Sequence, residues 1–376
     1  MHATRPPRLH RPARHRGFSL VEILVGVVIG LVAVLVIYQV FAVSEGLKRN
    51  TTAAGDAQTA GLFTTFLLGQ EIGNGGAGLA VSGIDLATCT NTGDIKTLMR
   101  PVPVLITDGG ADDVSDNVVV FYTVARTLIS PALFGPGAFK AGADFVAQSP
   151  NGFDKAGGDL IVAIDGAGKC AASKTSKVSD PDASGLVTIE HSAVADDFSD
   201  SSVLMNFGPA NRVQKVRYDI DKDILRSQSL LDSDGQPSAA EPVNPVASNI
   251  ALLKIQYGVE TNNDGIIEWV RGSDKDGPWD PATVMGSPQA TLAQIRAVRI
   301  GVIVRTDQPV TKLDAEGSDW QAYVQSGYNW TLFDCSTHDA KCVGRLTGTL
   351  GAYKGQYFRY RTYEQVIPLR NAIWNK

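Results

Sequence analysis

The sequence predicts an α+β protein: a long N-terminal α-helix, its first half transmembrane, packs on a C-terminal antiparallel β-sheet domain. Two observations lead to this prediction. Residues 18–43 form a run of 26 residues with one charged member, Glu22, and no proline occurs between Phe18 and Ile72. Beyond residue 79, short β-branched and aromatic runs alternate with clusters of Gly, Pro, Asp, Asn and Ser, as strands and loops do.

The apolar run 18–43 is long enough to cross a bilayer, since roughly 20 apolar residues suffice for a helix. The arginines that precede it are Arg5, Arg8, Arg11, Arg14 and Arg16, and no acidic residue precedes Gly17. Positive flanks stay in the cytoplasm, so we expect a single-pass protein whose residues 73–376 form a β-rich domain in the periplasm.

Charge and length exclude several classes of protein. The net charge of −5 becomes −10 without residues 1–17, and an acidic body is a poor electrostatic partner for nucleic acid.

A cleaved secretory signal is an alternative interpretation of the apolar run, because Ala42-Val43-Ser44 resembles a signal-peptidase site. The apolar run is, however, longer than the 7 to 15 residues typical of a signal core, and it contains a charge.

The segment "RGFSLVE", residues 16–22, resembles the processing site of type IV pilins and type II secretion pseudopilins. The resemblance implies that residues 1–17 are a leader, and that a prepilin peptidase cuts between Gly17 and Phe18 and methylates Phe18. It also implies that Glu22 pairs with the Phe18 amine of a neighbouring subunit in a filament. Opposite charges attract strongly in an apolar bundle, and either alone is costly. Alternatively, Glu22 reaches back to the lipid headgroups.

Gly26 and Gly30 form a G-x-x-x-G spacing on one helix face. This spacing lets a second helix approach closely, although glycine is common in membrane helices in any case. Helix packing at these two residues is therefore one of two open hypotheses.

The helix is expected to span residues 18–72, about 80 Å at 1.5 Å per residue. A thin apolar stripe in its second half should pack on the β-sheet domain. Its expected members are Leu47, Ala54, Ala57, Gly61, Thr65, Leu68 and Ile72. A helix half in the bilayer and half on a soluble domain matches the pilin fold.

Eight strands are predicted from their residue types. They cover residues 117–125, 159–165, 185–191, 215–221, 223–230, 249–260, 297–306 and 357–369. The fourth and fifth should form a hairpin around Asp221-Lys222-Asp223. Residues 131–158, rich in Gly, Pro and Ala, are expected to be a long surface insertion.

Three C-terminal segments resemble PilW-type minor pilins and their GspJ-like pseudopilin relatives: "IALLKIQYGVETNNDGIIEW", "IGVIVRT" and "VIPLRN". This resemblance implies a structural minor pilin of the type IV pilus that helps to prime assembly at the tip, in pilus biogenesis, twitching motility and adhesion. Its implied partners are other minor and major pilins, the inner-membrane assembly platform, the prepilin peptidase and a large tip adhesin. The implied location is the inner membrane and then the pilus.

Two other functions stay open. A minor pseudopilin of type II secretion would have the same N-terminal helix and the same ion pair but would assemble in the secretion system instead of the pilus. A binding module at the pilus tip would use the long insertions to recognise a surface or an adhesin. An enzyme is not expected, because the sequence has no nucleophile elbow, phosphate-binding loop or H-E-x-x-H motif.

Four cysteines fit an oxidising compartment on the far side of the membrane. Of the three possible connectivities, we favour Cys335 with Cys342, a short loop, and Cys89 with Cys170. A metal site is disfavoured because no C-x-x-C pair occurs.

No cofactor is expected, with calcium as a weak alternative. Glu260, Asn262, Asp264 and Glu268 fall at positions 1, 3, 5 and 9 of the calcium-loop pattern, but position 12 is Arg271 instead of glutamate. The Asn-Asp-Gly sequence is also a good turn between two strands, and we favour the turn.

Overall fold

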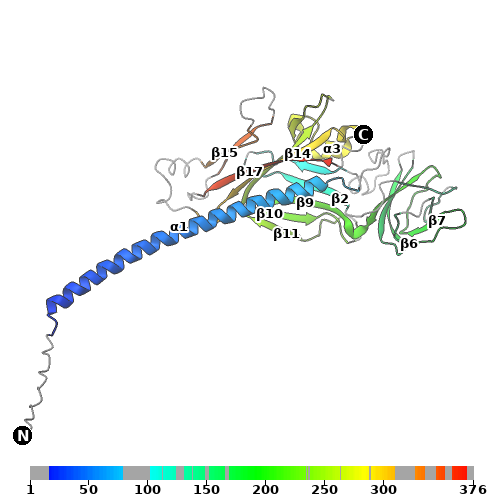
Figure 1. Ribbon diagram of the computed structural model, residues 1–376. Helices are drawn as coiled ribbons and strands as arrows, with labels where there is room; N and C mark the ends of the chain where they lie inside the picture. The colour runs from blue at the N-terminus through cyan, green and yellow to red at the C-terminus, as the bar shows by residue number, and fades with distance from the viewer. Residues whose placement is uncertain are drawn as a thin grey trace, which may run out of the picture. The chain divides into compact units, whose positions relative to one another are not determined.

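The computed structural model describes residues 17–78, 102–111, 113–123, 131–137, 139–148, 152–165, 169–233, 235, 238–262, 264–287, 289–309, 327–334, 344–351 and 358–370. The chain divides into two compact units, one up to Ala53 and one from Ala54 onward. The fold is α+β, as predicted: one long helix is followed by an antiparallel β-sheet domain (Figure 1).

Helix α1 (Leu20–Asn74) begins two residues later and ends two residues later than predicted. It is long and apolar enough to cross a membrane, and none of its most apolar stretch is buried in the structure. The absence of proline lets the backbone hydrogen bonds continue through all 55 residues.

The described residues of the second unit form four antiparallel sheets. The five-stranded sheet has the order β1 (Val104–Thr107), β2 (Asn117–Thr123), β9 (Val213–Asp221), β10 (Ile224–Ser229) and β11 (Val243–Ser248). The four-stranded sheet has the order β13 (Glu268–Arg271), β12 (Ile250–Val259), β14 (Ile295–Arg305) and β17 (Tyr360–Pro368). The six-stranded sheet has the order β3 (Ala132–Leu133), β8 (Val203–Pro209), β5 (Asp159–Ile164), β6 (Cys170–Val178), β7 (Val187–His191) and β4 (Phe145–Ala147). A two-stranded sheet pairs β15 (Tyr328–Leu332) with β16 (Leu346–Leu350).

Short helices complete the described fold. They are η2 (Ala210–Arg212), η3 (Asp274–Asp276), α3 (Pro281–Gly286) and α4 (Gln289–Leu292). The Asp280 carboxylate caps α3 by accepting hydrogen bonds from the Ala282 and Thr283 N–H groups at 3.0 and 3.1 Å. All eight predicted strands are present.

The second half of α1 packs on the β-sheet domain through one narrow face. Ala57, Gly61, Thr64, Leu68 and Ile72 are buried at spacings of three and four, so they form a single stripe. The predicted stripe was therefore largely right. It was wrong at Leu47, which is 58% exposed, and it placed Thr65 where Thr64 is buried.

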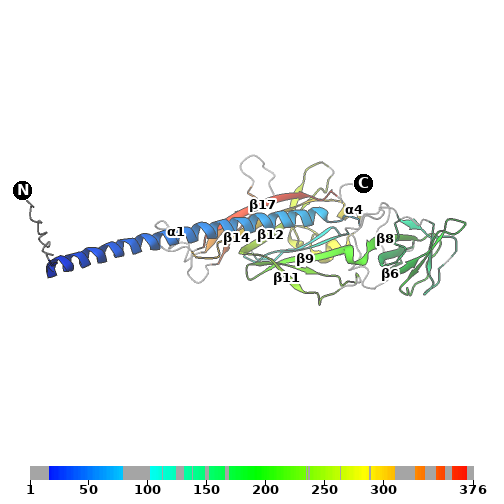
Figure 2. The same ribbon diagram turned by 60° about the horizontal axis from the view of Figure 1, so that its bottom comes forward.

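Two small helix residues let α1 approach β17 closely (Figure 2). A Cβ atom added to Gly61 would lie 2.2 Å from Cε2 of Tyr363, and one added to Gly69 would lie 2.7 Å from Oε1 of Gln365. The Gly61 contact is with an aromatic ring, whereas the Gly69 contact is with the end of the flexible, exposed Gln365 side chain, which can move aside. The close packing of α1 on β17 thus depends chiefly on glycine at position 61.

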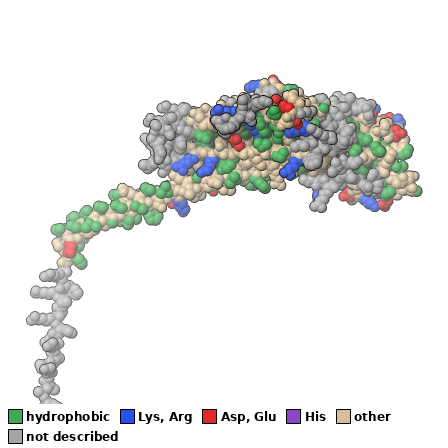
Figure 3. Space-filling view, turned by 45° about the horizontal axis from the view of Figure 1, so that its top comes forward, with side chains coloured by type: hydrophobic (Ala, Val, Ile, Leu, Met, Phe, Trp, Pro, Cys, Tyr) green, Lys and Arg blue, Asp and Glu red, His purple; other side chains and the backbone are tan. Residues whose placement is uncertain are grey.

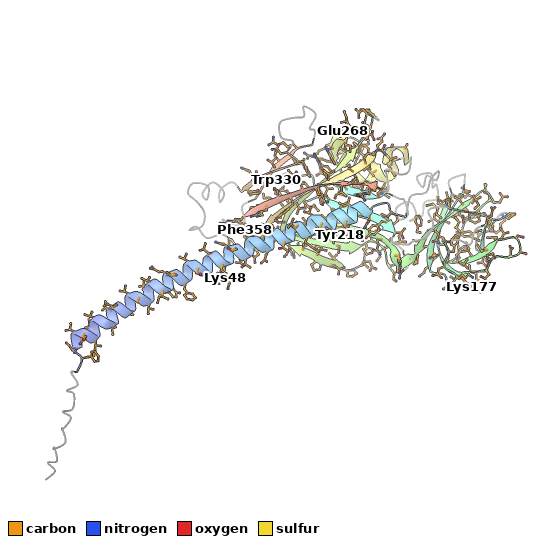
Figure 4. All side chains as sticks on the ribbon, in the orientation of Figure 1. Lys48, Lys177, Tyr218, Glu268, Trp330 and Phe358 are labelled. Atoms are coloured by element: carbon orange, nitrogen blue, oxygen red, sulfur yellow. The ribbon has the colours of Figure 1, made fainter. Side chains whose placement is uncertain are left out.

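A carboxylate also holds α1 to the five-stranded sheet. The Tyr122 hydroxyl on β2 donates a hydrogen bond of 2.8 Å to Oε2 of Glu71. Tyr218 on β9 interacts with the same carboxylate. The pKa of the Tyr218 hydroxyl is raised, mainly because this group is buried and also because it lies beside the Glu71 carboxylate. Figure 4 shows Tyr218 beside the C-terminal part of α1.

The main core lies between α1 and the five- and four-stranded sheets. It includes Leu68, Ile72, Val120, Leu253 and Ile300, all fully enclosed. Tyr257 is a fully buried member of this core, and its hydroxyl accepts a 2.6 Å hydrogen bond from the Ile106 N–H group. A buried hydroxyl needs such a partner, so Tyr257 ties β12 to β1.

The predicted β9–β10 hairpin is confirmed. Asp221 pairs with Ile224, so the connection has two residues, Lys222 and Asp223, with φ of 51° and 60°. Two positive φ values define the type I′ turn, which matches the twist of the paired strands.

The expectation for residues 131–158 was wrong. This stretch contributes β3 and β4 to the six-stranded sheet, and three of its four phenylalanines, Phe134, Phe139 and Phe145, are 1%, 8% and 2% exposed. They cluster with Phe198 at ring-centroid distances of 4.8 to 6.3 Å. The Gly- and Pro-rich composition concealed these aromatic residues, each of which buries a large apolar area.

We predict that Gly61→Ala destabilises the second unit by about 1–3 kcal/mol, because the new Cβ overlaps the Tyr363 ring. Gly55→Ala is the matched control on the same helix: no heavy atom lies within 4 Å of its Cβ, and alanine should stabilise the helix by about 1 kcal/mol. Urea unfolding of the detergent-solubilised chain measures both changes. Equal stability of the two variants would contradict the close packing on β17.

Candidate assembly site

The candidate assembly site is the start of α1. Gly17, Phe18 and Ser19 precede the helix, and Phe18 is 79% exposed. The helix backbone begins with the Ile23 N–H group, which donates a 3.2 Å hydrogen bond to the Ser19 carbonyl. Residues 1–16 of the predicted leader lie outside the described residues.

Glu22 lies in the first turn of α1. The first N–H groups of a helix have no partner within the helix and carry partial positive charge, so a carboxylate here is favourable. The partial positive charge at the helix N-terminus is too small to neutralise the full negative charge of a carboxylate. Phe18 lies four residues before Glu22, so an amine on Phe18 would place a full positive charge near the same end of the segment.

The first part of α1 is apolar on every side. Its large apolar side chains from Leu20 to Val43 are between 49% and 78% exposed. Figure 3 shows hydrophobic side chains covering the visible face of this segment. A helix that is hydrophobic all round is stable only when lipid or other helices cover it. This segment therefore requires an environment that the rest of the chain does not provide.

Gly26 and Gly30 lie on this segment, and a Cβ atom on either would meet no heavy atom within 4 Å. The chain itself therefore gives no packing reason for glycine at these two positions. The face they share is free to receive another helix, which is what the packing hypothesis requires.

Sequence reasoning missed three apolar residues on the second half of α1. Leu62, Phe63 and Phe66 are 54%, 45% and 69% exposed. Their positions fall outside the stripe that packs on the β-sheet domain. The sequence could have shown them as large apolar residues on the face of the helix that points away from this domain.

The comparisons with known proteins agree with this site. Residues 12–38 match the family model described as the prokaryotic N-terminal methylation motif, and residues 217–371 match the model described as type IV pilus-assembly protein W. The two matches confirm the predicted resemblance and support a type IV pilin-like minor pilin that is anchored by its N-terminal helix. The search of curated proteins and the search of solved structures each find no match.

Of the four cysteines, Cys170 lies within the described residues. It begins β6, is fully buried and is disulfide-bonded. Cys89, Cys335 and Cys342 lie outside the described residues, so the predicted pairing stays a prediction.

Arg299 contacts the described residues on both sides of positions 335–343, the range that includes Cys335 and Cys342. The guanidinium of Arg299 lies 4.3 Å from the ring centroid of Phe333 and donates a 2.8 Å hydrogen bond to the Gly344 carbonyl. Arg299 therefore links the two described segments that flank these positions.

Two of the four side chains of the calcium candidate, Glu260 and Asp264, already accept hydrogen bonds from groups of the protein. One Glu260 oxygen accepts a 2.9 Å hydrogen bond from Arg296, and the other accepts a 3.2 Å bond from the Gly265 N–H group. Asp264 accepts from the Ile266 N–H group at 2.8 Å. Asn262 lies in the same loop, and Glu268 begins β13. These contacts favour the turn, and calcium binding stays a prediction.

His191 is engaged in the structure of the six-stranded sheet. Its Nδ1 lies 2.7 Å from the Ser192 carbonyl, and its ring stacks on Phe145 with a centroid distance of 3.9 Å. Ser173, 3.0 Å from Nδ1, is 2% exposed and donates its proton to the Ser192 carbonyl. These contacts position the ring and leave Ser173 out of reach of a substrate.

We predict that Glu22→Ala leaves cleavage after Gly17 intact but lowers incorporation into filaments by at least about tenfold. Removing one partner of a buried ion pair costs about 3–5 kcal/mol, because the neighbour's amine is left alone in an apolar bundle. The measurement is the amount of this protein in sheared filaments. Glu45→Ala, an exposed acid on the same helix beyond the apolar run, is the control and should incorporate normally. Normal recovery of Glu22→Ala would refute the pairing.

We also predict disulfides between Cys335 and Cys342 and between Cys89 and Cys170. Digestion of the unreduced protein followed by mass spectrometry identifies the joined peptides. A peptide that joins Cys335 to Cys89 would overturn this connectivity.

Proposed function

We propose that this chain is a structural minor pilin of the type IV pilus, which assembles through α1 and helps to prime the pilus at its tip. The observation that carries the proposal is the fully exposed apolar segment of α1 with its single acid, Glu22, immediately after the Gly17-Phe18 sequence. Such a segment has a use only where lipid or other helices surround it.

In this proposal, prepilin peptidase cuts after Gly17 in the cytoplasm and methylates the new amine of Phe18. The subunit waits in the inner membrane, with residues 73–376 in the periplasm. It then moves from lipid into a bundle of pilin helices, where Glu22 meets the Phe18 amine of a neighbour. Both environments are apolar, so the ion pair gives the transfer its direction.

The proposed activity is packing rather than catalysis. The matched families are structural, and within the described residues no group of three His, Cys, Asp or Glu side chains is placed to hold a metal. The proposed partners are other minor and major pilins, the prepilin peptidase and the inner-membrane assembly platform.

A second candidate is a binding module at the pilus tip, with a surface or a large tip adhesin as its target. The six-stranded sheet favours it, because residues 132–209 lie between β2 and β9 and outside the matched segment 217–371. The aromatic core of this sheet is separate from the main core. Figure 4 labels Lys177, which lies on β6 of the same sheet. A groove of about 480 Å³ on this sheet is lined by Gly157, Gly158, Lys174, Thr175, His191 and Ser192.

The third candidate, a minor pseudopilin of type II secretion, shares the same N-terminal chemistry. The match of residues 217–371 to a pilus-assembly model favours the pilus over the secretion system.

Deletion of the encoding gene should abolish or strongly reduce surface pili and twitching, because the tip complex would lack a subunit. Electron microscopy of pili, a twitching assay, an attachment assay and a secretion assay distinguish the three candidates. Loss of protein secretion with normal pili would favour the pseudopilin. Normal pili with failed attachment would favour the binding module.

A further inference from the structure

A lysine is buried on the central strand β12 of the four-stranded sheet. All ten residues of β12 are buried, and Lys254 is the charged one among them (Figure 2 labels this strand). Lys254 is 4% exposed, so its ammonium does not reach solvent as lysine side chains usually do. Its partners must therefore be found inside the protein.

Two carboxylates face this lysine. Nζ of Lys254 lies 3.1 Å from Oδ1 of Asp116 and 3.9 Å from Oδ1 of Asp108, and it donates a 3.1 Å hydrogen bond to the Ala111 carbonyl. The exposed fractions of the three charged side chains are 6% for Lys254, 3% for Asp116 and 6% for Asp108. Both acids come from the turn between β1 and β2, so the cluster joins the five-stranded sheet to the four-stranded sheet.

The Asp116 carboxyl group is polarised on both oxygens. Oδ1 accepts a 2.9 Å hydrogen bond from the Gly109 N–H group, and Oδ2 accepts a 2.7 Å bond from the Ile255 N–H group. Burial raises the pKa of Asp116 to about 6, although Lys254 lowers it. The carboxyl group is thus fixed in position beside the amine, and burial favours its neutral form.

Asp108 has an unused buried oxygen. Oδ1 accepts a 3.2 Å hydrogen bond from the Gly110 N–H group, whereas Oδ2 is buried and has no hydrogen-bond partner among the described residues. An unsatisfied buried carboxylate oxygen is costly in a purely structural ion cluster. It is suited to accept a proton.

We propose that Lys254 and Asp116 condense to form an intramolecular isopeptide bond, with Asp108 carrying the proton between the amine and the leaving oxygen. The observation behind it is a buried amine held against an acid whose two oxygens are bound by backbone N–H groups, next to a second acid with a free oxygen.

The reaction needs no external reagent. The Lys254 ammonium passes one proton to Asp116, which gives a neutral amine and a carboxylic acid. The Nζ lone pair attacks Cγ of Asp116, and the Ile255 N–H group stabilises the negative charge on Oδ2. Asp108 takes a proton from the attacking nitrogen and gives it to the departing Oδ1 hydroxyl. The C–N bond forms, the C–O bond breaks and one water leaves, so Asp108 ends as it began.

Burial promotes this condensation in two ways. It holds the reacting groups together in a fixed geometry, and it keeps out the water that drives the reverse reaction. The product would link residues 116 and 254 covalently, so the two sheets that pack on α1 would be joined, and the inserted six-stranded sheet would lie within the closed loop.

Peptide mapping tests the proposal on the full chain extracted from membranes in detergent. The sample is reduced, denatured and digested with trypsin, and the peptides that contain Asp116 and Lys254 are identified by mass spectrometry. We expect one branched peptide, lighter than the sum of its parts by one water, and no cleavage after Lys254. Two linear peptides with cleavage after Lys254 would overturn the proposal and leave the cluster as an ion pair.

Three variants define the roles of the residues. Lys254→Arg keeps the positive charge but should give linear peptides. Asp108→Asn should also give linear peptides, because an amide does not accept the proton; a branched peptide in this variant would overturn the role of Asp108. Asp219→Asn, which removes a carboxylate that binds Arg226 outside the cluster, is the control and should keep the bond. A melting curve for each variant shows that it is folded.

Discussion

The structure depends on the different surroundings that the two halves of one helix require. From Leu20 to Val43, α1 has apolar side chains on every side and none of them is covered. From Ala57 to Ile72, the same helix buries a single stripe against β-sheets that belong to the same chain. The first half must be surrounded by lipid or by helices of other molecules. The carboxylate of Glu22 is then stabilised if these surroundings supply a positive charge and destabilised if they do not.

Much of this organisation could be predicted from the sequence. The helix, the β9–β10 hairpin and the long strands β12, β14 and β17 each show a strong local pattern: continuous apolar residues, a tight polar turn or β-branched runs. The start of α1 could be predicted for the same reason, because Gly17, Phe18 and Glu22 are adjacent in the sequence and their meaning does not depend on tertiary contacts.

The rest could not be predicted because it depends on residues that are distant in the sequence. Strand β11 contains Pro245 and lies at the edge of its sheet, where proline is tolerated but the strand pattern is weak. Strand β6 has small and polar residues, and pairing with β5 and β7 decides its conformation. Lys254 carried one visible signal, a charge inside an apolar strand, but its partners lie 138 and 146 positions away in the chain.

The contact between α1 and β17 joins parts of the chain that are made at opposite ends of synthesis. Gly61 and Gly69 lie on the N-terminal helix, whereas Tyr363 and Gln365 lie on β17, 302 and 296 positions later in the chain. A chain that stops before residue 360 would carry all of α1, yet the second half of this helix would lack part of its supporting surface. Synthesis of β17 is thereby a condition for full packing of α1, so a chain truncated before this strand differs in its fold from one that contains it.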